Sequence, residues 1–238
     1  MLYAMVNGER VEATRSTKGK CPFCENEVLS KCGEIYAWHW AHIKNEICDS
    51  WYEPETDWHR NWKLIFGKEN TEIIIYQDGK KHIADVKTTE GYILELQNSI
   101  IESHTIRDRE EFYGSNMLWI INGKKFKDGF RIFLGNSMPF DNYSPEFDRF
   151  AKLHGFTPKY RPTGDMAGAV EWNFIWKRAR QCWSEARRPV FIDFGGDKLF
   201  QMTIGIGRAK GMGQEIAKYD FIKRHKGNAT LLSTVIDS

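Results

Sequence analysis

Short apolar runs separated by turn residues predict the strands in the first half of the chain. Residues 82–86 read as one strand and residues 92–96 as the next, because the polar, glycine-containing stretch 88–91 supplies a turn between them. Residues 72–76 form an earlier apolar run, and residues 117–123 read as a buried strand that ends in a turn. This region is therefore expected to contribute four strands.

A helix is predicted immediately before these strands, over residues 55–66. Thr56 or Asp57 is suited to cap its N-terminus, because short polar side chains accept hydrogen bonds from the free backbone N–H groups there. Side chains four residues apart lie on the same face of a helix. One face of this helix then presents Glu55, His59 and Lys63.

A second helix is predicted over the polar, periodic residues 99–113. The resulting order of helix, three strands, helix and strand is that of an α/β fold. Farther along, the pattern predicts a strand at 130–134, a short helix at 144–155, a longer helix with periodic tryptophans at 170–187 and a hairpin at 189–202.

Two acidic residues interrupt the apolar runs of the middle strands: Asp85 and Glu95 each have apolar neighbours on both sides. A carboxylate is costly to bury in such surroundings unless it has a partner. Two carboxylates on adjacent strands can share a divalent cation, and Mg²⁺ is usually held by one or two carboxylates with water and substrate phosphate. The spacing also fits two solvent-facing positions on half-buried strands, so the pattern alone leaves both interpretations open.

Several short motifs follow one another in a specific order along the chain: residues 21–24, 39–42, 55–59 with Lys63, 84–86, 95–99, 109–113 and 118–120. Together they resemble the competence protein CoiA-like nuclease family of the PD-(D/E)XK nuclease superfamily, over roughly residues 3–123. The resemblance implies an α/β fold with a PD-(D/E)XK nuclease core, in which helices flank a central mixed sheet. It also implies a small N-terminal zinc-binding module and an α+β C-terminal extension packed on the core.

The resemblance assigns roles to individual residues. Asp85 and Glu95 would be the metal-binding carboxylates. Gln97 stands where most members of the superfamily carry lysine, a Glu-x-Gln variant found in part of the CoiA-like family. Asp57 matches the acidic residue carried by the first helix, where glutamate is more usual, and Glu55 is a second candidate for that role.

These residues suit the hydrolysis of a phosphodiester by an in-line water, because bound Mg²⁺ or Mn²⁺ lowers the pKa of water and neutralises phosphoryl charge. Lys63 is the candidate for the positive charge that Gln97 lacks, since an amide can only hydrogen-bond. His59 is a candidate either for proton transfer or for a structural hydrogen bond. We therefore expect a divalent-metal-dependent DNA nuclease. Gln97, and Asp57 in place of glutamate, favour the alternative of a non-catalytic nucleic-acid-binding or recombination accessory protein that retains the fold.

Five cysteines give a second chemical signal. An odd number, without the apolar run of a secretory signal, argues against a disulfide framework and for the reducing cytoplasm. Two cysteines spaced by two residues, followed by two similarly spaced histidines, fit a four-ligand structural Zn²⁺ site. The predicted ligands are Cys21, Cys24, His39 and His42. Cys32 or Cys48 could replace one of the histidines.

Length and charge set the outer limits of these predictions. A chain of 238 residues allows one large domain or two small ones. The predicted units are a zinc-finger-like module at 1–50, the nuclease core at 51–123 and the C-terminal extension at 124–238.

The expected partner is DNA, single- or double-stranded, although a net charge of +2 does not indicate a constitutive non-specific DNA binder. Trp40, Trp51 and Trp58 are candidates for stacking on unpaired bases. No apolar run approaches the length of a membrane span, so we expect a cytoplasmic protein with no membrane partner. The sequence leaves open whether it acts as a homo-oligomer or with a partner protein.

Overall fold

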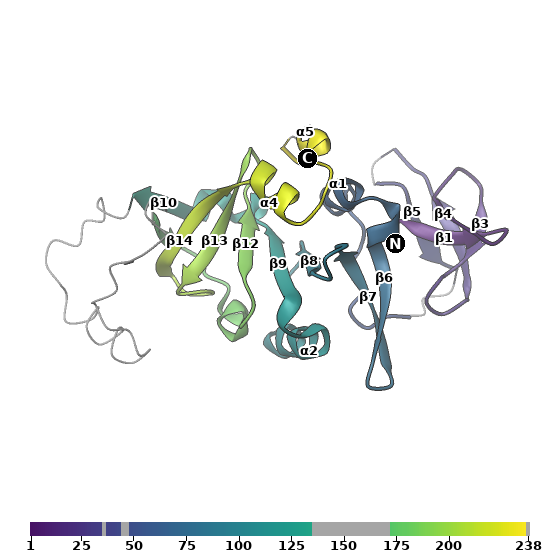
Figure 1. Cartoon of the computed structure of the whole chain (residues 1–238), viewed down its shortest axis with the longest axis horizontal. Helices are drawn as coiled ribbons and strands as arrows, with labels where there is room; N and C mark the ends of the chain where they lie inside the picture. Colours follow the sequence, from purple (N-terminus) through teal and green to yellow (C-terminus); the bar gives the residue numbers. More distant parts are fainter. Residues whose placement is uncertain (35–36, 44–47, 135–171, 237–238) are drawn as a thin grey trace, which may run out of the picture.

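The computed structural model of the protein describes residues 1–34, 37–43, 48–134 and 172–236. The helix expected at 144–155 lies outside these described residues. Two sheets form the described part of the chain, and the N-terminal one lies at one end of the elongated arrangement (Figure 1).

The N-terminal sheet has five antiparallel strands in the order β2-β1-β3-β4-β5. They are β1 (Tyr3–Val6), β2 (Glu9–Glu12), β3 (Lys18–Lys20), β4 (Glu27–Lys31) and β5 (His39–His42). Its small core contains Ala4, Val28 and Trp40, all buried, and Cys21 packs against them. With so few apolar residues to bury, this sheet is a unit that a bound metal would stabilise considerably.

The second sheet has nine strands in the order β10-β11-β14-β13-β12-β9-β8-β7-β6. Their bounds are β6 (Thr71–Gln77), β7 (Lys80–Lys87), β8 (Ile93–Gln97), β9 (Met117–Asn122), β10 (Phe130–Leu134), β11 (Trp172–Trp176), β12 (Val190–Asp193), β13 (Lys198–Ile204) and β14 (Lys210–Ala217). Strand β9 pairs in parallel with both β8 and β12, and the other pairs are antiparallel. The sheet is thus mixed, and it runs without interruption across the boundary expected after residue 123.

Helices cover both faces of this sheet. Residues of α1 (Asp57–Phe66), α4 (Lys218–Arg224) and α5 (Leu232–Ile236) pack on one face, and α2 (Ser103–Tyr113) and the 3₁₀ helix η5 (Gln181–Glu185) on the other. Strand β9 shows why both faces need cover, because Met117, Trp119 and Ile121 enter one core while Leu118 and Ile120 enter the other. Further 3₁₀ helices are η1 (Lys68–Asn70), η2 (Gly114–Asn116), η3 (Lys124–Gly129) and η6 (Ala229–Leu231).

The predicted helices and strands of the first half are confirmed, and so are the strand at 130–134 and the hairpin formed by β12 and β13. The predicted helix at 170–187 is wrong. Trp172–Trp176 is instead strand β11, which pairs with β10 and β14, and Phe174 and Trp176 are fully buried. The alternation of Trp172, Phe174 and Trp176 is a period of two, and the tryptophans beyond it gave the segment a false helical period.

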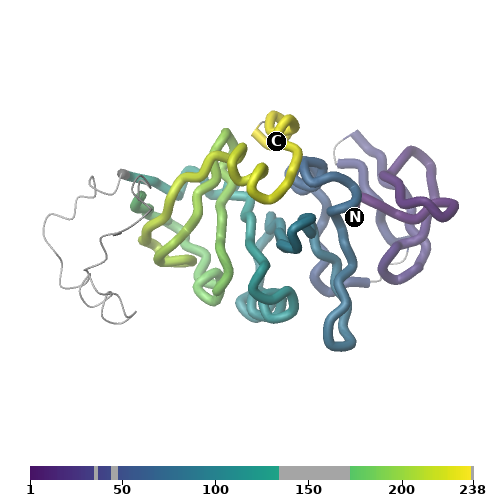
Figure 2. Tube along the Cα trace, in the orientation of Figure 1, coloured from purple at the N-terminus to yellow at the C-terminus, as the bar shows by residue number. Residues whose placement is uncertain are grey.

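The C-terminal segment returns to helix α1, as the tube in Figure 2 shows. The side-chain amide of Asn61 on α1 donates to the carbonyl of Thr234 at 2.8 Å. Trp58 and Trp62, also on α1, donate their indole N–H groups to one carboxylate oxygen of Asp193 at the end of β12, at 3.0 and 2.9 Å. Contacts with residues far along the chain therefore fix the position of helix α1, independently of the side chains that it contributes to the site.

Candidate functional site

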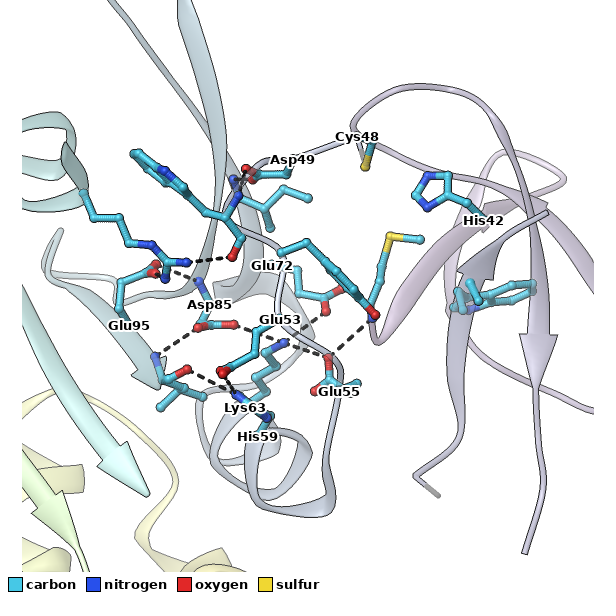
Figure 3. A pocket seen from close by; sticks show the side chains of 18 residues that line it. His42, Cys48, Asp49, Glu53, Glu55, His59, Lys63, Glu72, Asp85 and Glu95 are labelled. Atoms are coloured by element: carbon cyan, nitrogen blue, oxygen red, sulfur yellow. Dashed lines mark hydrogen bonds and ion pairs between the residues drawn. The ribbon is translucent and has the colours of Figure 1, made fainter. Parts of the chain in front are cut away.

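A cavity of about 520 Å³ lies where the N-terminal sheet meets the nine-stranded sheet (Figure 3). Its lining comes from Met1, β5, the segment 48–55, α1, β6, β7, β8 and α2. The sequence-predicted residues that line it are Glu55, His59, Lys63, Asp85, Glu95 and His42. Carboxylates predominate, as Figure 3 shows, and basic groups from α1 and α2 lie among them.

Asp85 and Glu95 come together where the ladder between β7 and β8 opens. The two strands pair at Val86–Leu94 and beyond it towards the turn, but not at Asp85. At this point the backbone N–H groups donate to carboxylate side chains in place of carbonyls of the neighbouring strand. Leu96 N–H donates to Asp85 Oδ2 at 2.9 Å, and Asp85 N–H donates to Glu95 Oε1 at 3.3 Å. Each carboxylate is therefore held by the other strand, next to the cavity.

Glu95 is buried and its carboxylate contacts Arg109 of α2 at 2.8 Å. Burial, together with the neighbouring charge of Asp85, nevertheless raises the pKa of Glu95 to about 8. Arg109 is itself positioned by a 2.7 Å hydrogen bond to the carbonyl of Trp51. A second positive charge close to Glu95 would relieve this unfavourable burial of like charges.

Lys63 lies at the centre of the cavity's acidic groups. Its ammonium contacts Glu55 at 3.0 Å, Glu72 at 3.1 Å and Asp85 at 3.2 Å (Figure 3). Burial alone would lower the pKa of Lys63, but the three carboxylates raise it well above its ordinary value. Lys63 is only 4% exposed, so its ammonium is held inside the protein and is not solvated at the surface of the helix.

Glu72 reaches Lys63 from a position opposite Asp85 in the pairing of β6 with β7. The register runs without a shift from Thr71, opposite Val86, to Ile73, opposite Ala84, and Glu72 between them has φ of +49°. Its two carboxylate oxygens accept the backbone N–H groups of Leu2 and Tyr3, at 2.6 and 3.0 Å. Sequence reasoning missed Glu72, because an apolar run gives no sign that its first residue adopts a positive φ.

Glu55, and not Asp57, is the acidic residue that α1 brings to the cavity. Thr56 caps the helix by accepting from the His59 N–H, so the helix begins at Asp57 and the Asp57 side chain is exposed to solvent. Glu55 lies one residue before the cap and is buried, and Lys63 holds its pKa below the ordinary value in spite of that burial.

One oxygen of Glu55, Oε1, is buried without a hydrogen-bond partner among the described residues. Four carboxylates, those of Glu55, Glu72, Asp85 and Glu95, also outnumber the three cations that contact them. These cations are Lys63, Arg109 and the N-terminal ammonium of Met1, which lies 3.6 Å from Glu55. An orphaned carboxylate oxygen, an excess of negative charge and hard oxygen donors all fit a divalent cation.

Gln97 and His59 both face a residue that sequence reasoning missed, Glu53. Gln97 Nε2 donates to Glu53 Oε1 at 3.1 Å, and His59 Nε2 lies 3.0 Å from Glu53 Oε2 and 3.2 Å from the carbonyl of Leu96. Because Nε2 faces two acceptors, it carries the hydrogen. The hydrogen bond from His59 lowers the pKa of Glu53 to about 2 against the opposing effect of burial. No periodic pattern marks Glu53, which lies in the irregular segment before α1.

That irregular segment also connects the cavity to the N-terminal sheet. Asp49 accepts from Ile83 N–H at 2.8 Å and contacts His82 at 2.9 Å, which ties the segment to β7. The ring of Trp51 stacks on His82 with a centroid separation of 3.3 Å. Trp51 therefore has a structural contact, and Trp40 and Trp58 are buried, so none of the three is free to stack on a base.

A cluster of four metal-ligating side chains lies beside the cavity. The ligand atoms of Cys21, Cys24, His42 and Cys48 all lie within 4.8 Å of one another, and these residues could hold a metal ion such as zinc. Cys21 and Cys48 have their sulfurs 3.9 Å apart, close to the roughly 3.8 Å that a tetrahedral ion with 2.3 Å bonds to sulfur requires. The hydrogen bond with Cys48 lowers the pKa of the Cys21 thiol to about 5. Figure 3 shows Cys48 and His42 at the edge of the cavity.

The predicted ligand His39 is replaced by Cys48. His39 and His42 are both on β5, and residues three apart on a strand point to opposite faces of the sheet. His39 instead places its Nδ1 2.7 Å from the carbonyl of Ala37. Cys32 is not a member of the cluster either, so of the two spare thiols it is Cys48 that joins Cys21, Cys24 and His42.

Residues 5–50 match the family described as competence protein CoiA, N-terminal domain. This segment contains the whole Cys/His cluster. Neither the curated proteins nor the solved structures yielded a match to the chain. Within the described residues, no helix has both the length and the apolar character needed to cross a membrane.

Proposed function

We propose that this protein is a divalent-metal-dependent DNA nuclease with a PD-(D/E)XK-type site. The observation that carries the proposal is the convergence of Asp85 and Glu95, from neighbouring strands, on a cavity that also holds the buried ammonium of Lys63. The match of residues 5–50 to the N-terminal domain of a competence protein supports it, because the sequence motifs of the first half resemble the same family.

Asp85 and Glu95 are the residues that would hold Mg²⁺ or Mn²⁺. Glu55 could join them, because it contacts the same Lys63 ammonium that Asp85 contacts. The bound cation would supply an activated water and neutralise charge on the phosphoryl oxygens. Arg109 fixes the Glu95 carboxylate, and the Leu96 N–H fixes that of Asp85, so both are oriented before any ligand arrives.

Lys63 is the better candidate for the positive charge near the reacting phosphate. It contacts Asp85 directly, whereas the Gln97 amide is engaged by Glu53. A buried ammonium held by three carboxylates keeps its charge and its position, and such preorganised charge is what stabilises a transition state. His59, with its hydrogen on Nε2, orients the end of β8 through the Leu96 carbonyl.

We propose further that Cys21, Cys24, His42 and Cys48 bind a structural Zn²⁺, since four protein ligands leave no open coordination position. Two of the four ligands come from strand β5 and the segment that follows it, so the ion would close the N-terminal sheet onto the start of the 48–55 segment.

The decisive experiment is cleavage of single- and double-stranded DNA with Mg²⁺ or Mn²⁺ by the wild type and by Asp85→Asn and Glu95→Gln. These substitutions keep shape but remove metal ligands, and the rate should fall by several orders of magnitude. Glu111→Gln is the matched control, because Glu111 is exposed on α2 and does not line the cavity. Equal cleavage by all four proteins would refute the assignment.

A second candidate function is non-catalytic nucleic-acid binding. The observation that favours it is that Gln97 offers no charge and its amide is already bonded to Glu53. DNA binding without cleavage by the wild type, unchanged in Asp85→Asn, would support this candidate.

A further inference from the structure

Four hydrogen-bond donors converge on the Glu53 carboxylate. The donors to Oε1 are Gln97 Nε2 at 3.1 Å and Ser99 N–H at 2.5 Å, and the donors to Oε2 are Asn98 N–H and His59 Nε2, both at 3.0 Å. Both oxygens of one anion are thus satisfied by two consecutive backbone N–H groups, an amide and an imidazole. Consecutive backbone N–H groups aimed at one point form an anion-binding concavity.

Two of the four donors, Gln97 and His59, are buried side chains on a strand and a helix, whereas Asn98 and Ser99 follow the end of β8. The acceptor belongs to the irregular segment before α1. Gln97 ends strand β8 with its side chain buried, and His59 is buried in α1. Glu53 lies between Tyr52 and Pro54, which are both exposed. The two buried donors would therefore stay in place if Glu53 moved away, and the exposed stretch around Glu53 is what has to move.

The anion site adjoins the carboxylate that is proposed to bind metal. The backbone N–H of Leu96 donates to Asp85. Two and three residues farther along the chain, the N–H groups of Asn98 and Ser99 donate to Glu53. Leu96 also accepts from His59, so one residue links the two places. An anion in the place of the Glu53 carboxylate would lie beside Asp85 and any cation bound there.

We propose that the Glu53 carboxylate occupies the subsite for two oxygens of a phosphodiester, and that the substrate phosphate displaces it. The inference rests on the proposed function for the identity of the ligand. A carboxylate and a phosphate present similarly spaced acceptor oxygens to N–H donors. Glu53 then acts as an internal competitor that keeps the subsite closed until a phosphate held by the metal replaces it.

An internal competitor lowers the apparent affinity for phosphate by the fraction of molecules in which the subsite is open. Removing Glu53 must therefore tighten phosphate binding, whereas removal of a residue that merely positions Gln97 and His59 would weaken it. The direction of the change separates the two roles. If the subsite is open in about one molecule in ten, removal of Glu53 should raise the affinity for phosphate about tenfold.

The test measures binding of inorganic phosphate, and of a thymidine dinucleotide whose phosphate is a diester, by calorimetry without added divalent cation. Glu53→Ala should bind both at least about tenfold more tightly than the wild type. Glu111→Ala, which removes the same charge from an exposed site, should bind as the wild type does. Adding Gln97→Leu to Glu53→Ala should reverse the gain, because it removes one of the four donors.

Unchanged or weaker binding of both probes by Glu53→Ala would overturn the inference, and a gain for inorganic phosphate alone would overturn the assignment to a diester. If Glu53→Ala does not fold, Glu53→Gln decides in the same way, since it removes the charge and keeps the shape. The readout does not involve cleavage. Tighter binding in a protein that never cuts DNA would overturn the proposed nuclease alone, and cleavage with unaltered phosphate binding would overturn this inference alone.

Discussion

Asp193 is expected to be the most sensitive polar residue for stability outside the cavity. It is fully buried, and its carboxylate accepts from the indoles of Trp58 and Trp62 and contacts Lys218 at 2.8 Å. Lys218 is also fully buried, and burial lowers its pKa in spite of Asp193. Because Trp58 and Trp62 lie on the helix that carries His59 and Lys63 to the site, this network fixes the position of that helix.

Replacing Asp193 by alanine leaves the Lys218 charge buried without its counter-ion. Breaking a buried ion pair from one side costs about 3–5 kcal/mol, and each buried donor left unpaired costs about 1–3 kcal/mol more if it finds no new partner. Lys218 keeps one hydrogen bond, to the carbonyl of Val235 at 2.9 Å, which offsets part of the loss. We expect the free energy of unfolding to fall by about 5 kcal/mol, and the melting temperature by about 10–20 °C.

Urea unfolding at pH 7, followed by tryptophan fluorescence and circular dichroism, measures this loss. The double variant Asp193→Leu with Lys218→Met should recover most of it, because a buried pair can be replaced by apolar side chains of similar volume. Glu185→Ala is the control: it breaks an ion pair with Arg107 in which both side chains are more than 40% exposed, and it should cost at most about 1 kcal/mol. A loss of less than about 1 kcal/mol for Asp193→Ala would refute the reasoning.

Three further predictions concern the site. Cys48→Ser should lose the zinc measured by elemental analysis and lower the melting temperature, whereas His39→Gln should retain both. Because the pKa of Glu95 is raised to about 8 from an ordinary 4.5, its contribution to the stability of the metal-free protein is fully present below pH 4.5 and lost as the pH rises through 8. Mn²⁺ affinity, measured by titration calorimetry, should correspondingly rise up to about tenfold per pH unit and level off above pH 8, and a flat profile would contradict this. Lys63→Met should slow single-turnover cleavage about a hundredfold, near 3 kcal/mol, while DNA affinity changes little; a rate within twofold of the wild type would contradict it.

The apolar periodicity of the sequence determined the elements that build the first half of the fold. Asp85 and Glu95 could be placed on neighbouring strands, and His59 and Lys63 on one helix face, because these relations are local and follow from the two backbone periods. Cys21 and Cys24 could be predicted to belong to one cluster for the same reason, since both lie in one short turn.

Relations between distant segments were decided only by the tertiary structure. Cys48 rather than His39 completes the cluster because β5 turns the two histidines to opposite faces. Glu72 enters the cavity from a strand position with a positive φ, and Glu53 from an irregular segment that binds the end of β8. Neither feature leaves a periodic trace in the sequence. Strand β11 takes its form from pairing with β10 and β14, which overrides the spacing of its tryptophans. Local periodicity therefore fixes which face a side chain occupies, but packing and strand pairing decide which distant side chains share that face.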